Sequence, residues 1–122
     1  MARVLVLTAD LLFGSKLQGM LSAADHEVEL LADEDLLRVA LLREPAGVVI
    51  ADLTSEELKA VQAVRELREE GFLEAVPLLA YYSHVEPAVR ELALADGFDL
   101  VVPRSRMARE AAQLVAQLAA GA

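Results

Sequence analysis

The sequence predicts an α/β fold in which a five-stranded parallel sheet lies between two layers of helices. Two observations support this prediction: five short apolar runs alternate with longer helix-period segments, and most of these runs are apolar at every position. Such runs are typical of parallel strands that helices cover on both faces. Repeated strand–helix units are joined by right-handed crossovers, so a three-layer sandwich is expected.

The expected strands are short and are separated by polar or turn-forming residues. They comprise residues 4–7, 28–31, 48–51, 78–81 and 100–102. The third run is entirely apolar, whereas residues 27–30 alternate between Glu and an apolar residue, as in a half-exposed edge strand. An edge position for the second strand favours the order 2-1-3-4-5 of a flavodoxin-like (βα)5 sandwich, with its crevice between the first and third strands.

The first two helices are expected from apolar spacing and from capping residues. The first covers about residues 11–24, and Asp10 precedes it as an N-cap. Asp33 is the expected cap of the second helix, which ends before the Pro-Ala-Gly turn at residues 45–47.

The last three helices are predicted from their ends and their apolar stripes. Thr54 is expected to begin the third helix, because its spacing to Glu57 fits a capping box. The fourth is expected over residues 87–95, with a proline in its first turn and Gly97 as its stop. The fifth is expected over residues 107–119.

The composition indicates a single domain over residues 1–122. With 56% hydrophobic residues the chain is apolar enough to form a packed core, and it is too short for an additional effector module. The formal net charge is −9 at pH 7, which disfavours binding to nucleic acid or to anionic membrane surfaces. The chain has no cysteine, and its first apolar run is too short for a signal peptide or a membrane span, so a cytoplasmic protein is expected.

The residues give no support to an enzyme. The chain has no Gly-x-Ser-x-Gly segment and no cysteine, and its two histidines, His26 and His84, are interpreted as surface or rim residues. A flavin or other small-ligand binder on the same fold is an alternative. The segment 8–13, however, lacks the Ser, Thr and Gly of a flavodoxin-type phosphate loop.

Four sets of residues have the order and spacing of a known family. They are residues 4–7 before an acidic site, 49–52 ending in Asp52, 76–80, and 95–99 followed by 102–104. Together they resemble the CheY-like receiver domain of bacterial response regulators, over nearly the whole chain. The resemblance implies two-component signal transduction, in which an Asp at the end of the third strand accepts a phosphoryl group in a phosphorelay.

The resemblance implies a role for each residue that follows a strand. Asp52 stands at the phospho-acceptor position, and Arg104 stands where the family has a lysine that pairs with the phosphoryl group. Thr8 and Ala9 occupy the positions of an acidic pair that helps to hold Mg²⁺, so Asp10 is the only carboxylate nearby.

The remaining positions also depart from the family pattern. Tyr82, with Ser83 beside it, stands where the family has a Thr or Ser that contacts the phosphoryl group. Val101 stands at the position of an aromatic switch residue. Because arginine presents a planar fork instead of a compact ammonium, Arg104 does not simply replace the lysine. These departures indicate a degenerate receiver.

Each site residue also has a structural interpretation. Asp52 can simply end a buried strand, and Asp10 is better placed to cap a helix than to bind a metal. No cofactor is indicated beyond Mg²⁺ at Asp10 and Asp52, which supply few of the oxygens that this ion requires. Arg104 is expected either to form a charge-assisted pair with Asp52 that persists without phosphate or to remain solvated. Tyr82 is expected either to donate to Asp52 or to pack at the strand end.

The leading hypothesis is a stand-alone, atypical response-regulator receiver, or pseudo-receiver, that acts by protein–protein contact, with phosphorylation at Asp52 reduced or lost. A working phospho-receiver is the first alternative, and the small-ligand binder is the second. The resemblance implies that a kinase, an effector or a second copy docks on the surface within Pro87–Ala119. Neither a nucleic acid nor a membrane is an expected partner.

Overall fold

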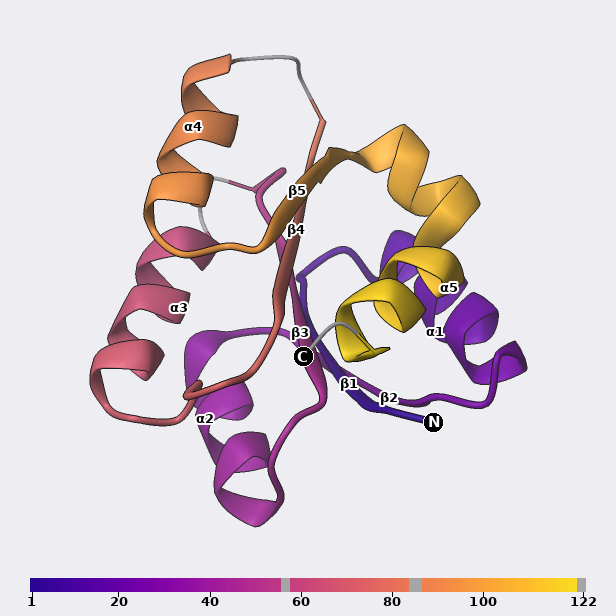
Figure 1. The fold of residues 1–122 in the computed structure, drawn as a ribbon, viewed down its shortest axis with the longest axis horizontal. Helices are drawn as coiled ribbons and strands as arrows, with labels where there is room; N and C mark the ends of the chain where they lie inside the picture. Colours follow the sequence, from indigo (N-terminus) through magenta and orange to yellow (C-terminus); the bar gives the residue numbers. More distant parts are fainter. Residues whose placement is uncertain (56–57, 84–86, 121–122) are drawn as a thin grey trace.

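The computed structural model describes residues 1–55, 58–83 and 87–120 of the chain. Strands and helices alternate throughout (Figure 1). The elements are β1 (Arg3–Leu7), α1 (Leu11–Ala23), β2 (Glu27–Leu31), α2 (Glu34–Arg43), β3 (Val48–Asp52), α3 (Ala60–Glu69), β4 (Leu78–Tyr82), α4 (Pro87–Ala95), β5 (Leu100–Pro103) and α5 (Arg104–Ala120). All strand pairs are parallel and the order is β2-β1-β3-β4-β5, which confirms the predicted fold class and the second strand at an edge.

Helices cover both faces of the sheet. In Figure 1, α1 and α5 lie on one face, and α2, α3 and α4 lie on the other. Because neighbouring strand residues point to opposite faces, β1 contributes Val4 and Val6 to the α1–α5 layer and Leu5 and Leu7 to the other layer. Each layer therefore buries its own apolar cluster. Within the described part of the chain, none of the helices is long and apolar enough to cross a bilayer.

The first two helices begin at the predicted caps. Asp10 accepts a 3.0 Å hydrogen bond from the backbone N–H of Phe13, and Asp33 accepts one of 2.8 Å from that of Leu36. In each case the carboxylate satisfies an N–H group in the first helical turn that has no intrahelical partner. Both capping predictions are confirmed.

The predicted start of the third helix is wrong. α3 begins at Ala60, after Lys59 in a left-handed conformation with a φ of 49°. The backbone N–H and the hydroxyl of Thr54 instead donate to the carboxylate of Asp52. Glu57, the other member of the predicted capping box, lies outside the described residues. The backbone N–H and the hydroxyl of Thr54, which were expected to form the capping box, are therefore engaged by the carboxylate at the strand end.

α5 begins earlier than predicted. It starts at Arg104, directly after β5, and not at Met107. Its first turn is polar, and Met107 is the first buried apolar residue of the helix. The predicted start was too late because it was placed at the beginning of this apolar stripe. The helix bends at Glu110, whose φ of −125° is not helical.

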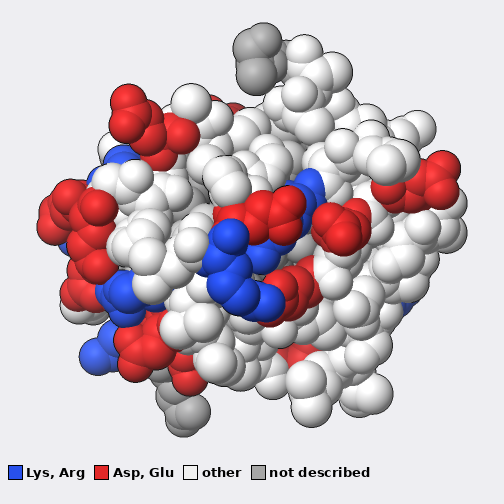
Figure 2. All heavy atoms as spheres, turned by 90° about the horizontal axis from the view of Figure 1, so that it is seen from below, with Lys and Arg blue, Asp and Glu red and all other residues white. Residues whose placement is uncertain are grey.

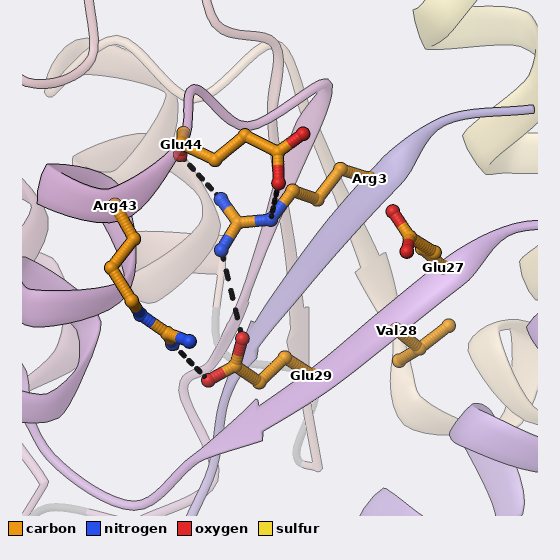
Figure 3. A pocket seen from close by; sticks show the side chains of 6 residues that line it. All are labelled: Arg3, Glu27, Val28, Glu29, Arg43 and Glu44. Carbon is orange, nitrogen blue, oxygen red and sulfur yellow. Dashed lines mark hydrogen bonds and ion pairs between the residues drawn. The ribbon is translucent and has the colours of Figure 1, made fainter.

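A charged network lies at the amino end of the sheet. Acidic and basic side chains lie side by side on the face seen in Figure 2. Figure 3 shows the side chains that line a hollow among them, whose volume is about 240 Å³. The guanidinium of Arg3 donates to the backbone oxygens of Ala40 and Glu44, and it pairs with the carboxylates of Glu29 at 3.6 Å and Glu44 at 3.5 Å. Arg43 pairs with Glu29 at 2.7 Å. Arg3 thus satisfies carbonyls at the end of α2 and ties that helix to β1.

Candidate functional site

Three polar side chains meet near the carboxyl ends of β1, β3 and β4, under α1 and α5. They are those of Thr8, Asp52 and Tyr81, which are 2%, 1% and 1% exposed. Each points toward the α1–α5 layer, since the residue two positions earlier packs there. The register places Tyr81 opposite Asp52 on neighbouring strands. The sheet therefore brings together residues that are far apart in the sequence.

The carboxylate of Asp52 accepts three hydrogen bonds from uncharged donors. The hydroxyl of Thr8 donates to Oδ2 at 2.7 Å. The backbone N–H of Thr54 donates to Oδ1 at 2.7 Å, and the hydroxyl of Thr54 donates to the same oxygen. A buried carboxylate requires such partners, because an unsatisfied one is strongly destabilising. These donors satisfy the charge of Asp52 without a cation.

Thr8 links Asp52 to the loop after β1. Its hydroxyl group donates to Asp52, and the hydroxyl oxygen accepts a 3.0 Å hydrogen bond from the backbone N–H of Asp10. Gly14 packs closely on it, since a Cβ at Gly14 would lie 3.1 Å from the methyl group of Thr8. The position that the family resemblance assigns to an acidic residue is thus occupied by a buried, hydrogen-bonded threonine.

Arg104 pairs with Asp10. Its guanidinium lies 3.2 Å from Oδ2 of Asp10, and Oδ1 of the same carboxylate caps α1. The guanidinium also lies over the ring of Phe13, 4.4 Å from the ring centroid. Because Arg104 and Asp10 are 43% and 38% exposed, this pair contributes little to stability. Of the two alternatives for Arg104, the pair with Asp52 is not formed; the side chain is partly solvated and pairs with Asp10, which lies closer to solvent.

Tyr81 is the residue at this site that sequence reasoning missed. Its ring packs on Phe13 with a centroid separation of 5.1 Å, and its hydroxyl is buried with no hydrogen-bond partner among the described residues. Burial raises the pKa of the Tyr81 phenol above its usual range, and the charge of Asp52 raises it further, while Thr8 acts in the opposite direction. The alternation of side chains along the strand was the signal that could have identified it: Tyr81, not Tyr82, shares a face with Asp52.

The other predicted site residues lie apart from this cluster. Tyr82 and Val101 are 8% and 3% exposed and pack in the opposite layer, with α2, α3 and α4. Tyr82 therefore has the packing role that the sequence allowed for it. Ala9 and Ser83 are exposed at the ends of β1 and β4. Nδ1 of His26 accepts a 3.1 Å hydrogen bond from the N–H of Ala2, which places this histidine at the amino end of the sheet.

His84 lies outside the described residues. Within the residues that the structure describes, no group of three or more His, Cys, Asp or Glu side chains could hold a metal. Asp10 engages Arg104 and the end of α1, and Asp52 engages Thr8 and Thr54. Mg²⁺ requires several freely available oxygens in near-octahedral geometry, so these two carboxylates do not fit the ion in this arrangement.

Solved structures that share this fold include receiver domains and response regulators. The receiver domain of the Francisella response regulator 1452 has a TM-score of 0.87 at 14% identity, covering 99% of this chain and 98% of that one. The chemotaxis protein CheY4 of Vibrio cholerae has a TM-score of 0.86 at 18% identity, covering 97% and 98%. NtrX of Brucella abortus, solved in complex with ADP, has a TM-score of 0.82 at 20% identity, covering 97% of this chain and 26% of its own. No family profile and no curated protein sequence matches the chain.

The chain thus has the CheY-like receiver fold of response regulators over its whole length. This confirms the fold that the resemblance implied. The low identities show that the fold is shared while most side chains differ. The chemistry must therefore be argued from this chain's own residues.

Proposed function

We propose that this chain is a receiver-like signalling module that acts by protein contact, and that phosphoryl transfer to Asp52 is reduced or lost. The observation that carries the proposal is the state of the Asp52 carboxylate. It is 1% exposed, and both of its oxygens accept hydrogen bonds from threonine donors.

Phosphoryl transfer would require much of this arrangement to change. A carboxylate oxygen must approach the phosphorus atom in line with the leaving group, while cations neutralise charge on the transferring group. Oδ1 and Oδ2 of Asp52 are buried and accept hydrogen bonds, and Arg104, at the position of the family's lysine, pairs with Asp10. The acidic-pair positions hold Thr8 and Ala9, which supply no carboxylate for Mg²⁺.

The same contacts favour a conformation of these loops that is held without phosphorylation. Thr8 and Thr54 hold the segments after β1 and β3 against Asp52. In a phosphorylated receiver, the modification would provide new contacts of this kind. Here neutral donors in the chain provide them, which supports a contact surface that needs no modification.

The proposed contact surface comprises α4, β5 and α5, within Pro87–Ala119. Leu92 on α4 is 64% exposed and Leu94 is 37% exposed, and Arg109 on α5 is largely exposed. Apolar side chains that are exposed to water are typical of protein-binding surfaces. A kinase, an effector or a second copy of the chain would dock there.

The test is the intact mass of the protein after incubation with Mg²⁺ and acetyl phosphate. The expected result is no phosphoryl adduct on the wild-type chain. The Thr8→Asp/Ala9→Asp variant returns carboxylates to the acidic-pair positions and removes one donor from Asp52, so it is expected to gain an adduct. That adduct should be absent when Asp52→Asn is added.

A phosphoryl adduct on the wild-type chain is the outcome that would contradict the proposal. A stoichiometric adduct on the wild type that disappears in Asp52→Asn would overturn the proposal and favour the working phospho-receiver. Circular dichroism spectra of all variants establish that each one is folded. An unrelated active receiver in the same reaction controls for the phosphodonor.

A further inference from the structure

A groove lies beside the Asp10–Arg104 pair, next to the first turns of α1 and α5. Its volume is about 530 Å³, which is within the range of small-molecule sites. Its lining comes from α1, the end of β4, the end of β5 and the start of α5. It lies in the same layer as Asp52, but neither Asp52 nor Thr8 lines it.

The charged residues that line the groove are both cations, Lys16 and Arg104. Lys16 has no ion-pair partner in the described ranges, and the only carboxylate that Arg104 contacts there is that of Asp10. Two exposed hydroxyls, those of Ser83 and Ser105, also line it. The groove faces the first turn of α5, where the helix dipole adds positive potential. Although the net charge of the chain is −9, these groups favour an anion locally.

The other part of the lining is apolar. Pro103, Ala108 and Phe13 contribute to it, and the ring of Phe13 lies under the guanidinium of Arg104 and is tilted by 50° against the ring of Tyr81. Phe13 is only 7% exposed, so the partly exposed Pro103 and Ala108 form most of the apolar wall. A rigid apolar wall beside cations is suited to a ligand with a planar body and a charged end.

We propose that this groove binds a small organic anion with a planar apolar body, of the class of aromatic carboxylates. Its carboxylate would accept hydrogen bonds from Lys16 and Arg104, and its ring would pack against Pro103, Ala108 and the exposed part of Phe13. Because Arg104 also holds Asp10, the ligand would compete with Asp10 for the guanidinium. The proposal does not depend on whether Asp52 accepts a phosphoryl group.

The test is a titration of isotope-labelled protein with benzoate, followed by backbone amide shifts. Saturable shifts are expected in residues 13–16 and 103–108, which border the groove. Benzyl alcohol keeps the ring and lacks the charge, and acetate keeps the charge and lacks the ring. Each is expected to bind at least about tenfold more weakly, since each loses one of the two kinds of contact.

Matched charge variants locate the site. Lys16→Gln and Arg104→Gln are each expected to weaken benzoate binding about tenfold, the loss of one charge-assisted hydrogen bond. Lys59→Gln and Arg109→Gln remove the same charges outside the groove and are expected to remain within about twofold of wild type. If one groove variant does not fold, the other is compared with its control variant.

Three results would overturn the proposal. The first is the absence of saturable shifts, or shifts confined to other parts of the chain. The second is an affinity for benzyl alcohol or for acetate that equals the affinity for benzoate, which would show that the groove does not recognise both the ring and the charge. The third is benzoate affinity in the folded groove variants that matches the affinity of the control variants.

Discussion

The hydroxyl of Thr8 donates a 2.7 Å hydrogen bond to Oδ2 of Asp52 and so joins the ends of β1 and β3 in a buried position. The same hydroxyl accepts from the N–H of Asp10, and Thr54 satisfies Oδ1 of Asp52. Neutral donors thus stabilise a buried carboxylate at the place where the family resemblance implies a metal and a phosphoryl group.

Thr8→Val should lower the free energy of unfolding by about 1–3 kcal/mol, because it keeps the side-chain shape and leaves Oδ2 of Asp52 and the N–H of Asp10 without their partner. Urea denaturation measures the change. Ser15→Ala, on the exposed side of α1, is the control and should change stability by less than about 0.5 kcal/mol. A loss in Thr8→Val no larger than in this control would contradict the importance of the bond.

Two substitutions of Asp10 separate its capping role from its ion pair. Asp10→Asn retains a good N-cap and removes the charge, so it should cost at most about 0.5 kcal/mol. Asp10→Ala removes the cap and should cost about 1 kcal/mol more. Thermal and urea unfolding give both values. Equal losses in the two variants would mean that the pair with Arg104 dominates.

Arg3→Gln should destabilise the fold by about 1–2 kcal/mol, because the carbonyls of Ala40 in α2 and of Glu44 at its C-cap lose their donor, the first of them in a partly buried position. Arg43→Gln is the matched control, since Arg43 is 60% exposed and forms one surface pair, and it should cost less than about 0.5 kcal/mol. Hydrogen exchange should accelerate at the end of α2 only in Arg3→Gln. Similar stabilities for both variants would argue against a stabilising role for the hydrogen bonds of Arg3 that connect β1 with α2.

The raised pKa of Tyr81 makes stability depend on alkaline pH. The unfolded chain releases this phenol proton near pH 10, whereas the native protein retains it to a higher pH. The native state therefore binds more protons above about pH 10, and the free energy of unfolding falls as the pH rises through that range. Tyr81→Phe should reduce the slope, and Tyr82→Phe should retain it. An unchanged slope in Tyr81→Phe would contradict this assignment.

At neutral pH, the same Tyr81→Phe substitution should be neutral or stabilising by up to about 1 kcal/mol. The hydroxyl that it removes is buried and has no partner among the described residues, so its loss abolishes a desolvation penalty and breaks no hydrogen bond. Urea denaturation tests this. A loss of more than about 1 kcal/mol would indicate that the hydroxyl is bonded in solution, to Thr8, to Asp52 or to a water molecule.

Much of the fold could be predicted from local patterns. The apolar run ending at Ala51, the alternating residues of β2 and the caps Asp10 and Asp33 each report on a few neighbouring residues, and all were interpreted correctly. The starts of α3 and α5 were not, because they depend on contacts that a local pattern does not contain. The backbone N–H of Thr54 donates to Asp52 and does not begin a helix, and the polar first turn of α5 follows β5 directly.

By itself, the sequence determined the order of strands and helices, the doubly covered sheet and the position of Asp52 at a strand end, because periodicity and capping are set by neighbouring residues. Only the tertiary structure decided that Asp52 is satisfied by Thr8, that Arg104 pairs with Asp10, and that Tyr81 lies opposite Asp52. These contacts join strand ends that are distant in the chain. They depend on sheet register and on which face each side chain takes, and a change of one residue in register would reverse that face.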